Sequence, residues 1–61
     1  MARQKYEVDF RFRNEYGEWV ADFLNNNGAG FTKTDALDIA RQLFESGCKD
    51  VKVYYLKREN I

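Results

Sequence analysis

The side chains with the greatest chemical potential in this sequence are one thiol and one close pair of carboxylates. Cys48 is the single cysteine, and the chain contains no histidine. A thiol nucleophile needs a neighbouring base, and a zinc site needs several Cys or His ligands. We therefore predict that Cys48 packs as a small apolar residue behind a helix, and that the protein holds no metal or cofactor.

The carboxylates are Glu7 and Asp9, two residues apart and so on one face of an extended strand. Paired carboxylates can do acid–base chemistry when a pocket drives their pKa values apart. In a domain this small we expect no concave site of about 300 Å³. The pair sits beside Lys5 and Arg11 on the open face of a short sheet, where cross-strand ion pairs and solubility explain it instead. The prediction is that the protein is not an enzyme.

A glycine-rich segment, residues 28–34, precedes a helical pattern. Backbone amides at such a place can hold a phosphate. The spacing matches neither the Walker loop nor the dinucleotide fingerprint, and Asp35 would repel an anion in the first turn. We interpret the segment as a connector.

Three strand patterns and one helix pattern must position these residues. Alternation of apolar and polar residues predicts strands over 5–13, 18–24 and 50–57. Asn14–Gly17 suits a type I turn between the first two strands. A single apolar stripe predicts a helix over 33–46.

The helix also carries clear end signals. Thr32 followed by Asp35 is a variant of the capping box, which places the N-cap at Thr32. Gly47 fits the left-handed residue that closes a helix, with Cys48 packing back on Leu43.

Residues 1–61 therefore form one α+β domain with the order strand, strand, helix, strand. A right-handed crossover places the third strand beside the first. The prediction is a three-stranded antiparallel sheet of order 2-1-3 with the helix on one face. The expected core comprises the apolar residues of the inward faces: Tyr6, Val8, Phe10, Phe12, Trp19, Phe23, Ala36, Ile39, Ala40, Leu43, Val51 and Val53.

Composition narrows the function. Ten basic and ten acidic residues give zero net charge, which excludes a strongly basic nucleic-acid binder but not a local patch. No run approaches the roughly 18 apolar residues of a membrane span. We expect a cytoplasmic protein without a membrane partner.

The third strand is the most informative segment for function. It has high β-propensity and no Pro or bulge signal, so it reads as a regular edge strand that invites another strand. Apolar residues are also expected on the uncovered sheet face. We predict a small non-enzymatic binding module, a homodimeric protein-interaction, accessory or inhibitor protein of bacterial or bacterial-virus type. Its expected contact residues are Val20, Leu24, Lys52, Tyr54 and Leu56.

An alternative is a nucleic-acid-binding module. The outer faces of the first and third strands collect basic residues around an aromatic ring, an arrangement that can hold phosphates and stack bases. The residues of this alternative are Arg3, Lys5, Arg11, Arg13, Lys52 and Tyr54.

Two resemblances accompany these alternatives. The Gly turn at Gly17, the run Gly30-Phe31-Thr32-Lys33 and the Ala-rich helix start resemble the arm-site DNA-binding domains of tyrosine recombinases. In that family the third strand precedes the helix, whereas here it follows. The strand–strand–helix–strand layout also resembles small dimeric inhibitors made by bacterial viruses, in architecture alone.

Overall fold

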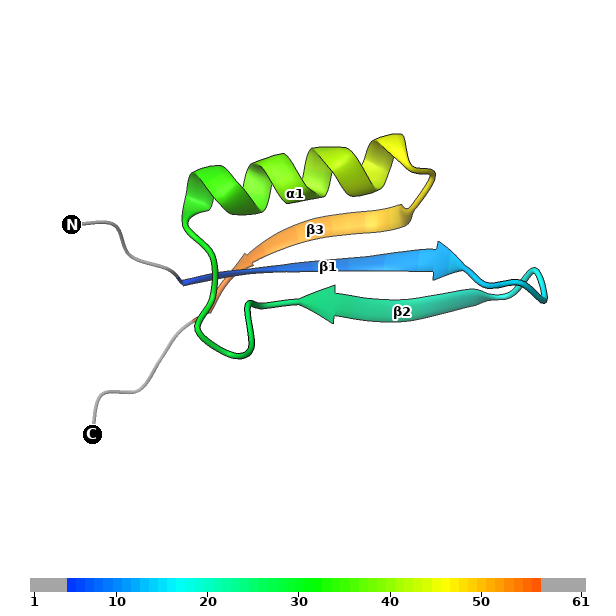
Figure 1. Cartoon of the computed structure of the whole chain (residues 1–61), viewed down its shortest axis with the longest axis horizontal. Coiled ribbons are helices and arrows are strands. Elements are labelled where there is room, and N and C mark those ends of the chain that lie inside the picture. Colours follow the sequence, from blue (N-terminus) through cyan, green and yellow to red (C-terminus); the bar gives the residue numbers. More distant parts are fainter. Residues whose placement is uncertain (1–4, 57–61) are drawn as a thin grey trace.

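The computed structural model describes residues 5–56. Strands β1 (Tyr6–Arg13) and β2 (Trp19–Leu24) form a hairpin, followed by helix α1 (Lys33–Glu45) and strand β3 (Lys49–Tyr55). The strands form one antiparallel sheet in the order β2-β1-β3, with α1 on one side of it (Figure 1). The predicted ββαβ fold and strand order are confirmed.

The turn between β1 and β2 fixes the register of the hairpin. The Gly17 amide donates to the Asn14 carbonyl (3.0 Å), and the Asn14 amide donates to the Glu18 carbonyl (2.8 Å). The Asn14 side chain also accepts from the Tyr16 and Glu18 amides, both at 2.9 Å. Gly17 has a positive φ of 81°, a conformation that glycine adopts at little cost. This closure places Arg13 opposite Trp19.

The register assigns the two faces of β2 and corrects the predicted core. Directly opposed residues share a face of a sheet. Val8 opposes Leu24 and Asp9 opposes Phe23. The even-numbered residues of β2 therefore lie on the helix side with Val8, whereas Trp19 and Phe23 lie on the opposite side. The prediction that Trp19 and Phe23 face the core was wrong. It took the face of β2 with the larger apolar side chains to be the buried one, but the turn had already fixed the register and with it the faces.

Helix α1 begins at Lys33, as the sequence predicted, and ends at Glu45, one residue earlier than predicted. The Thr32 hydroxyl accepts a hydrogen bond from the Asp35 amide (3.1 Å), which confirms the N-cap. At the other end Gly47 has a φ of 96°, its amide donates to Phe44, and the Cys48 amide donates to Leu43. This pair of bonds is the Schellman motif.

β3 is not a regular edge strand. Lys52 opposes Asp9 but Lys49 opposes Arg11, so β3 carries one extra residue at this point. Asp50 lies at this extra position and adopts a φ of 51°. The result is a bulge next to the start of the strand, and the prediction of an unbulged strand was wrong. Residues Val51–Tyr55 beyond the bulge keep a regular pairing with β1.

The core lies where α1 crosses β1 and β3. α1 packs against these two strands and makes no contact with β2 within residues 5–56. Val8, Phe10 and Ala36 are the buried apolar residues of the described chain. The other correctly placed members of the predicted core are half-buried: Tyr6, Phe12, Ile39, Ala40, Leu43, Val51 and Val53. All six residues of β2 are exposed.

The N-cap predicts a measurable difference between two threonines. Thr32→Ala removes the acceptor for the Asp35 amide and should lower the free energy of unfolding by about 1 kcal/mol. Thr34→Ala, in the exposed first turn, removes no cap and should leave stability unchanged. Urea unfolding of both variants decides the point, and equal effects would contradict a cap at Thr32.

Candidate binding face

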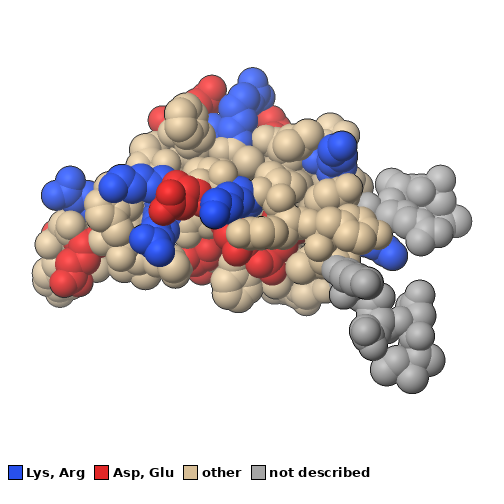
Figure 2. Space-filling model, turned by 180° about the vertical axis from the view of Figure 1, so that it is seen from behind, with Lys and Arg blue, Asp and Glu red and all other residues tan. Residues whose placement is uncertain are grey.

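The sheet side away from α1 is the candidate binding face, and we call it the open face. Its strand residues alternate with those that contact the helix, as the pairing registers show. Viewed from behind Figure 1, basic side chains intermix with acidic ones along the molecule (Figure 2). The strand residues of the open face are Glu7, Asp9, Arg11, Arg13, Trp19, Ala21, Phe23, Lys49, Lys52 and Tyr54.

Three aromatic rings stand on this face. Trp19 is 38% exposed, Phe23 55% and Tyr54 45%. The Lys49 ammonium sits 4.3 Å from the centre of the Trp19 ring, a cation–π contact that spans the sheet from β3 to β2. Aromatic rings therefore lie on both outer strands of the open face, with β1 between them.

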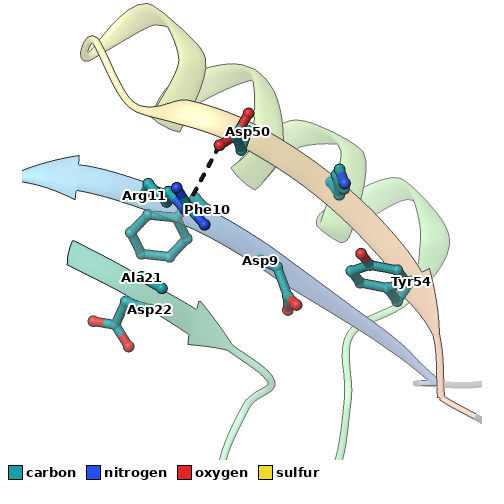
Figure 3. Close-up of a pocket in the computed structure, with 8 residues that line it drawn as sticks. Asp9, Phe10, Arg11, Ala21, Asp22, Asp50 and Tyr54 are labelled. Atoms are coloured by element: carbon teal, nitrogen blue, oxygen red, sulfur yellow. Dashed lines mark ion pairs between the residues drawn. The ribbon is translucent and has the colours of Figure 1, made fainter. Parts of the chain in front are cut away.

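The centre of the face is occupied by charges. Arg11 Nε lies 3.6 Å from Asp50 Oδ2, so the carboxylate at the bulge of β3 reaches back to β1 (Figure 3). Both side chains are well exposed, and such an ion pair contributes little to stability. Its effect is to occupy a guanidinium that would otherwise be available to a phosphate.

Glu7 and Asp9 form the second charged group. Burial, together with the hydrogen bond and the negative charge of Glu7, raises the pKa of Asp9 from 3.8 to about 6, although Lys52 acts to lower it. Asp9 Oδ1 is buried without a hydrogen-bond partner in the described chain. The Asn25 amide donates to Glu7 Oε1 (3.3 Å) and holds that side chain in place. The Asp9 carboxyl therefore gains or loses its proton near pH 6.

These groups border an open depression of about 350 Å³, which corrects the expectation that the domain forms no concave site of this size. Asp9 and Tyr54 lie at one end of it and the Arg11–Asp50 pair at the other (Figure 3). Within residues 5–56 no three Cys, Asp or Glu side chains gather as a metal site. Side chains from all three strands line the depression: Asp9, Phe10, Arg11, Ala21, Asp22, Asp50, Lys52 and Tyr54.

The predicted contact residues do not all lie together. Lys52 and Tyr54 are on the open face, and Leu56 follows them, half-buried, with its amide bonded to the Lys5 carbonyl. Val20 and Leu24 lie on the helix side of β2, so their predicted placement on the uncovered face was wrong. The register of β2 against β1 puts Val20 and Leu24 on the helix side, and it puts Trp19 and Phe23 on the open face.

The basic residues of the nucleic-acid alternative are partly brought together. Arg11, Arg13 and Lys52 share the open face with Tyr54. Lys5 directly precedes β1, and Arg3 lies outside the described residues. Lys49 joins this group, a residue that the sequence did not single out.

A second surface was missed. Leu37 and Phe44 are seven residues apart on α1 and expose 52% and 71% of their area, and Tyr55 at the end of β3 exposes 59%. Both residues belong to the apolar stripe of the helix, but neither was expected in the core. The signal available in the sequence was the breadth of that stripe, which exceeds what one sheet face can cover.

Comparison with protein-family models, curated proteins and solved structures finds no match to this chain. Among residues 5–56 no helix has the length and apolar character needed to cross a membrane. Functional inference therefore starts from the surfaces themselves.

The raised pKa of Asp9 predicts a pH dependence of stability. The folded state favours protonated Asp9, so this contribution is present below pH 3.8 and is lost as pH rises through about 6. Asp9→Asn stays neutral and should gain up to about 3 kcal/mol over the wild type at pH 7, at about 1.4 kcal/mol per pKa unit. The gain should shrink towards pH 4.

Urea unfolding at both pH values measures this difference. Glu18→Gln, which removes an exposed carboxylate at the turn, should follow the wild type. An Asp9→Asn variant that is less stable than the wild type at pH 7 would show that the carboxylate form is the favoured one.

Proposed function

We propose that this protein is a non-enzymatic binding module that recognises another protein through the open face and does so as a homodimer. The observation that carries the proposal is the exposure of Trp19, Phe23 and Tyr54 on a sheet face that no element of the described chain covers. Large aromatic rings on an uncovered face contribute nothing to a monomer's core, but they are the usual anchors of a protein interface.

The charges of the open face support a protein partner over a polyanion. Arg11 is paired with Asp50, and the Lys49 ammonium lies over the Trp19 ring. Arg13 donates from its Nε to the Gly17 carbonyl (3.2 Å). Glu7 and Asp9 add negative charge beside Lys52. Mixed charges of this kind fit a partner surface that also carries both signs, and they give specificity and register rather than raw affinity.

The small core supports self-association. Among the apolar residues of the described chain only Val8, Phe10 and Ala36 are buried, whereas nine large apolar residues are exposed. A chain of 61 residues has little stability to spare. Burying part of this surface against a second copy would stabilise the fold. An accessory or inhibitory role stays a prediction.

Nucleic-acid binding is the second candidate, and one observation favours it. The register adds Trp19 and Phe23 to the face that carries Arg11, Arg13, Lys49 and Lys52. Stacking rings beside cations are the elements of a single-strand binding surface. The acidic residues of the same face argue against it, because they repel phosphates.

Two adjacent residues of β2 provide a matched test. Phe23 and Leu24 are exposed by 55% and 41% and lie on opposite sides of the sheet. Phe23→Ser should abolish capture of a partner protein from a lysate of the source organism, whereas Leu24→Ser should retain it. The expected loss is at least tenfold, which corresponds to about 1.4 kcal/mol for one anchoring ring. Quantitative mass spectrometry of the captured proteins measures the difference.

Nuclease treatment and salt separate the two candidates. Capture of a protein partner should survive nuclease and depend weakly on salt, whereas phosphate binding weakens steeply. Trp19 is the only tryptophan, so its fluorescence reports directly on this face. Strong quenching by a single-stranded oligonucleotide that disappears at high salt would favour the second candidate. Equal capture by Phe23→Ser and Leu24→Ser would contradict the open face as the binding site.

A further inference from the structure

The two edges of the sheet are unequal. Backbone groups of an antiparallel strand point alternately to its two sides. The Leu56 amide donates to the carbonyl of Lys5, the residue just before β1. The backbone N–H and C=O groups of Lys52 and Tyr54, four and two residues earlier, therefore also point towards β1. Those of Val53 and Tyr55 point outward, and within residues 5–56 nothing is paired with them. The edge of β3 is therefore open.

The edge of β2 is blunted instead. The Asn14 amide donates to the Glu18 carbonyl, so the backbone groups of the even-numbered residues of β2 point towards β1. The backbone groups of Phe23 therefore point outward. Its amide is occupied by the Asp22 carboxylate (2.8 Å). A side chain that caps an edge amide is one way in which proteins discourage strand addition. Strand pairing with another chain is thus favoured at β3.

An apolar flank of the helix adjoins the open edge. In Figure 1 β2 and β3 point to the left, β3 lies above β1, and α1 is on the near side of the sheet, so the crossover from β2 to β3 is right-handed. Each residue of an α-helix turns about 100° clockwise when viewed from its N-terminus. If Ala36 points to the sheet, Leu37 and Phe44 therefore project away from β2, on the side of β3. Tyr55, on the helix side of β3, extends this surface.

From these observations we infer that β3 pairs antiparallel with β3 of a second copy of this chain. The inference builds on the proposed homodimeric function and names the surface that joins the copies. A two-fold axis near Val53 sets Val51 opposite Tyr55 of the partner and gives a sheet of six strands. Such an isologous contact closes on itself. It also sets Lys52 opposite the partner's Tyr54, so the two Lys52 ammonium groups do not oppose one another.

The geometry brings the helices to packing distance. Strands lie about 4.8 Å apart. α1 contacts both β1 and β3, and an axis midway between them would lie about 2.4 Å inside β3. The two-fold axis is about 2.4 Å outside β3. The helix axes are then about 10 Å apart, at the upper end of normal helix packing. Leu37 and Phe44 of both copies fill this space.

Charge is also compatible with this pairing. The last turn of α1 contains no basic residue to balance its dipole. The two helices run antiparallel, so Lys33 at the start of one helix lies towards the end of the other. A cation there is favourable. The open faces of the copies become continuous, which leaves Trp19 and Phe23 of each free for the partner protein.

Charge substitutions on the proposed contact surface test the inference. Analytical ultracentrifugation of the wild type from about 1 µM to about 200 µM should give twice the 7.2 kDa of the chain at high concentration. Tyr55→Glu and Leu37→Glu should weaken association at least tenfold. The matched controls Phe23→Glu and Leu24→Glu place the same charge on the two faces of β2, away from the edge of β3, and should leave association unchanged. Circular dichroism confirms that each variant folds.

A backbone variant keeps the test independent of side chains. The chain is short enough for chemical synthesis, and N-methylation of Val53 removes an outward donor without altering its side chain. It should also shift the chain to monomer, whereas N-methylation of Ala21 on the β2 edge should not. A wild type that stays monomeric, or a dimer that survives the Val53 change, would overturn the inference. Phe23→Ser should remain dimeric, so loss of partner capture and loss of the dimer are separate results.

Discussion

One helix cannot cover three strands, and the surface of this protein follows from that limit. An α-helix is about 10 Å wide with its side chains, and strands are spaced by about 4.8 Å. α1 rests on β1 and β3, so β2 has no helix against it. The full core shrinks to Val8, Phe10 and Ala36, and apolar residues remain exposed on both sides of β2 and on the outer flank of α1.

Local patterns in the sequence were enough to predict the helix and the strands. They could not predict which side of β2 faces the helix, because the β1–β2 turn sets it. Alternation, the Thr32 cap and the Gly47 signal predicted the four elements and their order correctly. The facing of β2 was predicted wrongly because Trp19, Ala21 and Phe23 look like the heavier apolar side. The Asn14–Gly17 closure sets the pairing, and the pairing sets the faces. Counting from Asn14 opposite Glu18 would have placed Trp19 beside Arg13 on the open face.

The bulge in β3 and the raised pKa of Asp9 could not be predicted from the sequence, for a different reason. Asp50 adopts a positive φ because β3 must fit one extra residue between Lys49 and Lys52, a requirement that arises only once the strands are paired. Asp9 acquires its raised pKa from burial beside Glu7 on the assembled sheet. Both are consequences of tertiary pairing, and spacing along the chain does not encode them.

The two proposals share out the exposed surface. The open face, with Trp19, Phe23 and Tyr54, is assigned to a protein partner, and the β3 edge with Leu37, Phe44 and Tyr55 to a second copy. The division keeps each site free for its own ligand. It also explains why one sheet edge carries a capped amide at Phe23 while the other is open.

Amide hydrogen exchange tests this account most directly, because it reads the β3 edge itself. In the strand-paired dimer the amides of Val53 and Tyr55 are hydrogen-bonded across the axis, so their protection should rise with protein concentration. The Trp19 and Ala21 amides on the outer edge of β2 serve as the internal reference and should exchange rapidly at all concentrations. Rapid exchange of Val53 and Tyr55 at the highest concentration would contradict the account.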